Sequence, residues 1–155
     1  DEIMEHANTS VNSKKSRTYI GGGTFSANPL TMIAGDTTLS ILKNKKNTLY
    51  KKLDALGNDT TKMLKKIFLN DVVVTGKGSL FMTHFPRNGM TEISNAADVA
   101  KCDSAKLFNY HFEMITKDGI FFLPGKLGAF SDAHSTADVR EMKKATERFV
   151  SNFKK

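Results

Sequence analysis

Apolar side chains recur at helical spacing through the first half of the chain. From Leu30 to Ile41 apolar or small residues return every three or four positions, and from Leu49 to Ile67 the steps alternate between four and three. Asn28-Pro29 precedes the first run, with Asn suited to the cap and Pro to the first helical position. The pattern predicts two successive helices, the second of them either kinked or divided at Gly57-Asn58.

The spacing changes to that of strands after Asp71. The β-branched run Val72–Val74 and the stretch Ser79–Phe85 are separated by a turn at Gly76–Gly78. Ile120–Leu123 is a further short apolar run. We therefore expect three short strands.

Two more helices are indicated in the second half of the chain. Ser104 is the expected cap of the first, Asp118-Gly119 is its expected end, and Ser135 with Asp138 forms a capping box before the second. Residues 86–103 are expected to form a long polar connection. The element order predicts an α/β fold of the α+β kind, a short, largely antiparallel three-stranded sheet with helices packed on one face. The expected inward-facing residues are Leu107, Phe108, His111, Phe112 and Ile115 in one helix and Val139, Met142, Thr146, Phe149 and Phe153 in the other.

Positive charge is concentrated between Lys43 and Lys66. The chain has 155 residues and a net charge of +7. A cationic stripe can bind nucleic acid, but this one lacks arginine, and its aromatic side chains, Tyr50 and Phe68, are too few for a stacking platform. We interpret the stripe as a solvated helix face, with a stand-alone nucleic-acid-binding module as the alternative. Its lysines are Lys43, Lys45, Lys46, Lys51, Lys52, Lys62, Lys65 and Lys66, against the acids Asp54 and Asp59.

Composition excludes several classes of protein. The length suits one domain, and the single cysteine, Cys102, excludes an internal disulfide framework. No apolar run reaches membrane-spanning length, and the N-terminus has no signal pattern, so we expect a soluble cytoplasmic chain without membrane contact. The dispersed histidines, among them His84 and His111, lack metal-ligand spacing, so no metal site is expected.

Two polar groupings could carry chemistry. His134 lies near Ser131 and Asp132, but without a nucleophile-elbow motif we favour a loop that hydrogen-bonds its own backbone over a catalytic pair. Lys101 beside Cys102 would lower the pKa of the thiol, although a lone thiol is usually incidental. No catalytic residue is assigned in this chain.

The glycine-rich segment Gly21–Ser26 is a candidate anion site. Its successive glycines allow backbone amides to converge, Thr24 adds a hydroxyl, and the helix start at Asn28-Pro29 follows directly. The spacing is neither that of a nucleotide P-loop nor that of a dinucleotide fingerprint. Spacing alone leaves open a flexible connection and a phosphate cradle, and it favours the connection.

The same segment carries a family resemblance. Gly22–Gly35 (GGTFSANPLTMIAG) resembles the G-G-T-F-S-x-N-P-x-x-M-x-A-G signature of class III pyridoxal-phosphate-dependent aminotransferases, and it is most similar to the glutamate-1-semialdehyde aminomutase branch. Further segments similar to those of the family are Tyr50–Gly57, Gly78–Phe85, Asp118–Ile120 and Ser131–Val139.

The resemblance implies the C-terminal part of such an enzyme, with the small domain of a fold-type I pyridoxal-phosphate protein. Residues 1–27 would be the tail of a large domain with the phosphate-binding loop, residues 28–58 connecting helices and residues 59–155 the small domain. The Schiff-base lysine of the family falls shortly before the stretch that matches Asp1–Glu5, and no lysine of this chain matches it. The chain alone is therefore expected to be inactive.

The resemblance also assigns two binding residues. In the family, the threonine at the position of Thr24 and the amides beside it, here at Gly23, bind the phosphate of the pyridoxal 5'-phosphate held by the neighbouring subunit. This implies a homodimer and an amino-acid-like small-molecule substrate. Residues 125–129 lack the glutamate that the aminomutase branch carries near the cofactor, so aminomutase and simple aminotransferase activity both stay open. A remnant that dimerises without catalysis is a further alternative.

Overall fold

The computed structural model describes residues 23, 27–87 and 89–153. The chain divides into two compact units, Asp1–Asn44 and Lys45–Lys155. The predicted division at residues 27 and 58 stays a prediction.

Helix α2 spans Pro29–Phe68 without a break, so the predicted pair of helices is a single helix. The predicted cap is confirmed: Asn28 Oδ1 accepts hydrogen bonds from the amides of Leu30 at 3.0 Å and Thr31 at 3.4 Å. Gly57 does not interrupt the helix. It is buried in it, because its bare Cα lets another segment approach closely.

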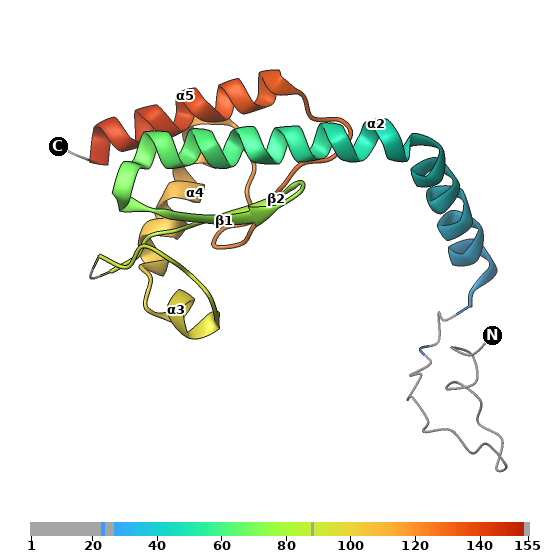
Figure 1. Cartoon of the computed structure of the whole chain (residues 1–155), viewed down its shortest axis with the longest axis horizontal. Coiled ribbons are helices and arrows are strands. Elements are labelled where there is room, and N and C mark those ends of the chain that lie inside the picture. The colour runs from blue at the N-terminus through green and yellow to red at the C-terminus, as the bar shows by residue number, and fades with distance from the viewer. Residues whose placement is uncertain (1–22, 24–26, 88, 154–155) are drawn as a thin grey trace, which may run out of the picture. The chain divides into compact units, whose positions relative to one another are not determined.

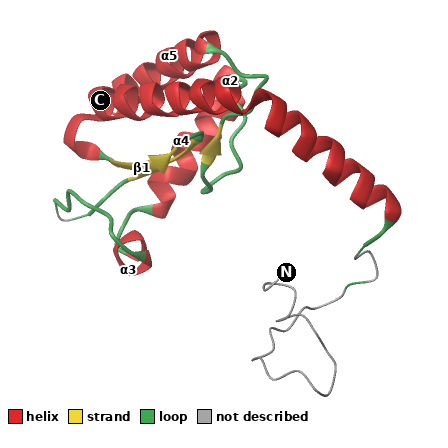
Figure 2. Cartoon of the chain, turned by 45° about the vertical axis from the view of Figure 1, so that its right-hand side comes forward, coloured by secondary structure: helices red, strands yellow, loops and turns green. Residues whose placement is uncertain are grey.

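The sheet of the described residues has three strands in the order β1-β2-β3: Val73–Lys77, Leu80–His84 and Gly128–Ala129. Both pairings are antiparallel. Gly78, with a φ of +61°, and Ser79 form the two-residue connection between β1 and β2. Within the second unit, α2 and α5 (Thr136–Phe153) run side by side over the sheet (Figures 1 and 2).

The third strand was predicted at Ile120–Leu123, and that prediction is wrong. The amide of Ile120 is bonded to the Met114 carbonyl at 2.9 Å as part of a helix end, and the segment continues as a loop. The edge of β2 is instead paired by Gly128 and Ala129. Gly128 lies against the ring of Phe81, where an added Cβ would come within 2.4 Å of the ring, so a residue without a side chain is required there.

The predicted long connection of residues 86–103 contains a short helix, α3 (Ala96–Ala100), that the sequence pattern did not indicate. Helix α4 spans Ser104–Asp118, and its cap is Asp103 rather than Ser104. The Asp103 side chain accepts from the amide of Lys106 at 3.0 Å, and its own amide donates to the Phe85 carbonyl at 2.7 Å. This tie to the end of β2 fixes the extended backbone that a cap needs.

Two other predicted helix ends are confirmed. Gly119 closes α4 in the left-handed conformation, with a φ of +67°. The capping box before α5 is present: the amide and the hydroxyl of Ser135 donate to Asp138 Oδ2 at 2.7 and 2.9 Å.

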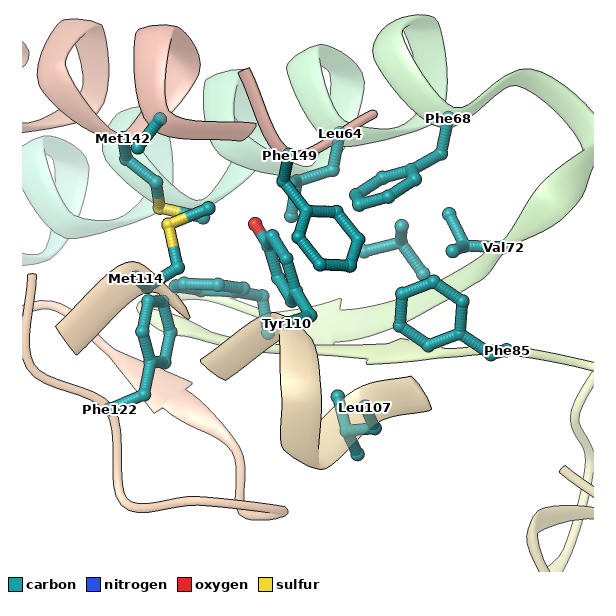
Figure 3. Close-up of a cluster of buried hydrophobic side chains, with 13 residues drawn as sticks. Leu64, Phe68, Val72, Phe85, Leu107, Tyr110, Met114, Phe122, Met142 and Phe149 are labelled. Atoms are coloured by element: carbon teal, nitrogen blue, oxygen red, sulfur yellow. The ribbon is translucent and has the colours of Figure 1, made fainter. Parts of the chain in front are cut away.

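The hydrophobic core lies between the helices and the sheet of the second unit (Figure 3). Tyr110 and Phe149 are at its centre, and their ring centroids are 5.1 Å apart. The predicted inner face of α4 is partly wrong, because Tyr110 and Met114 are buried while Phe108 and Phe112 are half exposed and stacked on each other. Apolar residues lie on two adjoining stripes of this helix, and spacing alone does not decide which one the sheet covers.

None of the helices of the described residues combines the length and apolar character that crossing a membrane requires.

Candidate functional site

The predicted phosphate cradle falls largely outside the described residues. Gly23 is described and exposed, whereas Thr24 and its neighbours Phe25 and Ser26 lie outside the described part of the chain. The assignment of Gly23 and Thr24 to phosphate binding therefore stays a prediction. The helix start beside the cradle is defined, and Asn28 Oδ1 already accepts hydrogen bonds from the amides of Leu30 and Thr31. An anion at this end of α2 would have to be bound by earlier amides or by side chains.

The described residues supply little of a pyridoxal phosphate site. No described lysine is buried. Of the candidate phosphate ligands, Gly23 alone is described.

The Ser131–His134 grouping is a loop that binds itself, as predicted. The amide and the hydroxyl of Ser131 both lie 3.0 Å from His134 Nδ1. Because the amide can only donate, Nδ1 is an acceptor and the hydroxyl donates to it as well. His134 thus helps to hold the turn before α5.

Asp132, in the same turn, binds two lysines of the predicted stripe. Lys45 Nζ lies 3.0 Å from its Oδ2, and Lys52 Nζ lies 3.3 Å from its Oδ1. Hydrogen bonds from these two ammonium groups lower the pKa of the Asp132 carboxyl. Part of the stripe therefore fixes this loop to α2. The other six lysines of the stripe are exposed, as expected of a solvated helix face.

His111 joins α4 to the loop that follows it. Its ring stacks on Phe122 at a centroid distance of 4.6 Å, and its Nδ1 accepts from the Gly125 amide at 3.2 Å. The residue is 2% exposed, and burial lowers its pKa to about 4. The ring is therefore neutral at pH 7, and its role is to position the loop.

The two remaining candidates have structural surroundings. His84 Nε2 is hydrogen-bonded to Thr75 Oγ1 across the hairpin at 2.8 Å, and burial lowers its pKa. The pKa of Cys102 was expected to fall beside Lys101, but burial and the nearby Asp98 carboxylate raise it. An activated thiol is therefore not formed. The described residues contain no cluster of histidine, cysteine and acidic side chains that could hold a metal ion.

Two hollows formed by described residues lie on the second unit. One, of about 290 Å³, lies beside β3 and is lined mainly by apolar side chains, with His134 and Asp138 at its edge. The other, of about 300 Å³, lies at the end of α2 and includes Asp71 and Lys106. Sequence reasoning missed both, because their linings come from segments far apart in the chain and no local motif marks them.

Curated relatives match most of this chain. The glutamate-1-semialdehyde 2,1-aminomutase of Ruminiclostridium cellulolyticum is 30% identical over an alignment 161 residues long. The alignment covers 97% of this chain and 34% of that protein. The protein of the same name from Methanobrevibacter smithii is 32% identical over 81% of this chain and 29% of its own length. The chain thus spans about a third of the length of these relatives. No protein-family model matches it.

Solved structures share the fold. An omega-transaminase from Sphaerobacter thermophilus superimposes with a TM-score of 0.63 at 26% identity, over 84% of this chain and 29% of that one. A β-phenylalanine aminotransferase from Variovorax paradoxus gives a TM-score of 0.61 at 21% identity, over 97% of this chain and 33% of that one, and this likeness shows the fold alone.

Proposed function

Because the chain belongs to the class III pyridoxal-phosphate-dependent aminotransferase family and spans about a third of the length of its aminomutase relatives, we propose that it serves amino-group transfer as the C-terminal part of such an enzyme. The match over 97% of the chain carries this proposal, and the mixed fold shared with transaminases supports it. In this proposal the active form is a cytoplasmic homodimer that acts on an amino-acid-like small molecule.

Within that enzyme, residues 59–155 would be the small domain, and the glycine-rich segment would reach a phosphate. A threonine hydroxyl and adjacent amides suit a dianion, because they donate hydrogen bonds without adding bulk. We assign this role to Thr24 and Gly23, for the pyridoxal phosphate of the neighbouring subunit. The chemistry of the family belongs to the cofactor, and protein groups orient it.

The 155 residues by themselves are proposed to be inactive. No described lysine is buried, and the side chains of the described residues that lie near one another support loops rather than a reacting centre. The test is a transaminase assay of the purified chain with pyridoxal phosphate, an amino donor and a keto-acid acceptor, alongside its near-visible absorbance. Turnover without any added full-length enzyme would refute this part.

A chimera tests the positive part of the proposal. The matching third of the Ruminiclostridium cellulolyticum enzyme is replaced by this chain, and the chimera is expected to bind pyridoxal phosphate. Thr24→Val should then weaken cofactor binding about tenfold or more, the usual effect of losing a hydrogen bond to a charged group. Thr37→Val is the matched control, because the Thr37 hydroxyl bonds only to the Ile33 carbonyl of its own helix. Equal affinity of the two variants would contradict the assignment of Thr24.

A further inference from the structure

The leading segment of α2, Pro29–Ile41, has apolar side chains on two opposite faces. At about 100° per residue, its exposed large apolar side chains fall into two groups that are roughly half a turn apart. The first group is Leu30, Ile33 and Ile41, and the second group is Met32 and Leu39. Asp36 is the single charged residue of the segment and lies between the two groups.

Neither face of the leading segment is covered by the described residues. Every residue from Leu30 to Ile41 is exposed, and the five apolar side chains range from 50% exposed at Ile41 to 76% at Leu30. A helix that is apolar on all sides is normally buried, and a gathering of exposed apolar side chains marks a surface that binds another polypeptide. Both faces therefore lack the cover that their composition requires.

The second part of the same helix has a different pattern. From Leu49 to Phe68 it buries one face, and its exposed lysines lie on the opposite face. The buried side chains of this part are Leu49, Leu56, Thr60, Leu64 and Phe68. Where α2 packs on its own chain it thus has one apolar face, whereas the leading segment has two. Two separate surfaces are needed to cover the leading segment.

Two hydroxyl groups of the leading segment are compatible with such a cover. Thr37 Oγ1 donates to the Ile33 carbonyl at 2.8 Å, and Thr38 Oγ1 donates to the Ala34 carbonyl at 2.8 Å. Burying a polar group is costly unless it is hydrogen-bonded, and these two hydroxyls are already satisfied within the helix. The segment can therefore lose its contact with water without leaving them unpaired.

We propose that the leading segment is held between two apolar surfaces of the part of the enzyme that the curated relatives contain and these 155 residues do not match. The match covers only 34% and 29% of two of these relatives, so enough chain remains to supply both surfaces. A second copy of the chain is a poorer cover, because a twofold interface uses the same patch on both copies and leaves the other face exposed. A cation or a hydrogen-bond donor is expected opposite Asp36.

This cover rests on the proposed function, because it belongs to the remaining part of the same enzyme. Its test measures only the accessibility of side chains, so it requires neither bound pyridoxal phosphate nor turnover. An inactive chimera with a covered segment would therefore refute amino-group transfer and support the cover, whereas an active chimera with an accessible segment would do the opposite.

The test compares the reactivity of introduced cysteines in the 155-residue chain and in the chimera with the Ruminiclostridium cellulolyticum enzyme. Ile33→Cys and Leu39→Cys place a thiol on each face, and Lys62→Cys is the control on the exposed lysine face of the same helix. Labelling with N-ethylmaleimide is followed by mass spectrometry of peptides, which separates these thiols from Cys102.

The thiols of Ile33→Cys and Leu39→Cys should react at least about tenfold more slowly in the chimera than in the chain, because a covered thiol reacts only when its cover opens. Lys62→Cys should react equally fast in both proteins. Fast labelling at either face in the chimera would overturn the proposal. Slow labelling at either face in the 155-residue chain would also overturn it, because a second copy or the chain itself would then supply the cover.

Charged substitutions in the 155-residue chain give a second measurement that does not need the chimera. Because the chain covers neither side chain, Ile33→Glu and Leu39→Glu should each move the thermal midpoint by less than about 3 °C. Leu64→Glu, on the buried face of the same helix, should lower the midpoint by about 10 °C or more. A loss at Ile33 or Leu39 as large as that at Leu64 would overturn the proposal.

Discussion

Gly57 of α2 lies directly against the main-chain carbonyl of Gly78 in the β1–β2 connection: a Cβ added to Gly57 would be 1.8 Å from the Gly78 oxygen. The helix and the hairpin can approach this closely only because Gly57 has no side chain. The contact fixes the position of the β1–β2 hairpin against α2, and with it the position of the core residues that the hairpin contributes.

Gly57→Ala is therefore expected to destabilise the chain by about 2–3 kcal/mol, because the methyl group meets backbone that cannot rotate away. Gly35→Ala, on the same helix, is the control. A Cβ there meets nothing within 4 Å, so alanine should stabilise the helix by about 0.5–1 kcal/mol. Urea unfolding followed by circular dichroism measures both, and equal stabilities of the two variants would contradict the close approach.

His111 should make stability depend on pH. Its pKa is about 4 in the folded chain and 6.5 as a free side chain, so below pH 6.5 the unfolded state binds the extra proton first. The contribution is fully present above pH 6.5 and is lost as pH falls towards 4. We expect a loss on the order of 2 kcal/mol from this residue over that interval.

His111→Asn tests this dependence. The asparagine oxygen can take the place of Nδ1 as the acceptor for Gly125, but it does not titrate. The variant should be less stable at pH 7, because it loses the stack on Phe122, yet its stability should fall less between pH 7 and pH 5. Burial also lowers the pKa of His84, and its contribution is common to both proteins. Parallel stability curves would show that His111 is not the titrating group.

The capping box of α5 should contribute measurably to stability. Ser135→Ala removes the hydroxyl that accepts from the Ala137 amide at 3.2 Å, and we expect a cost of about 1 kcal/mol. Ser151→Ala is the control, because that hydroxyl only bonds back to the Glu147 carbonyl within the helix. Thermal unfolding should separate the two variants by several degrees, and equal midpoints would count against the cap.

Arg148 ties α5 to α4 through two carboxylates. Its Nη1 donates to Glu113 Oε2 at 3.2 Å, its Nε donates to Asp118 Oδ1 at 3.2 Å, and its Nη2 contacts the other Asp118 oxygen. Lysine cannot reproduce this forked geometry, so Arg148→Lys is expected to cost about 1 kcal/mol. Lys144→Gln, which breaks an exposed pair with Glu141, should change stability by less than about 0.5 kcal/mol in urea unfolding. If Arg148→Lys lowered the stability less than Lys144→Gln, the role of Arg148 would be contradicted.

Local sequence signals determined where most elements begin and end. Asn28 before Pro29, Gly119 after α4, and Ser135 with Asp138 act within three or four residues of themselves, so their effects could be predicted without a fold. The family signature at Gly22–Gly35 is likewise a property of consecutive residues, and the aminomutases that match this chain agree with the resemblance.

Tertiary structure decided what depended on distant partners. Ile120–Leu123 has the composition of a strand, but Gly128 and Ala129 pair with β2, because only a glycine fits against the ring of Phe81. Packing against the rest of the second unit decides which stripe of α4 is buried, and the side chains of Phe108 and Phe112 stay half exposed. The hollow with Asp71 and Lys106 exists only where α2, β2, α4 and α5 meet, and no spacing along the chain encodes such a meeting of remote segments.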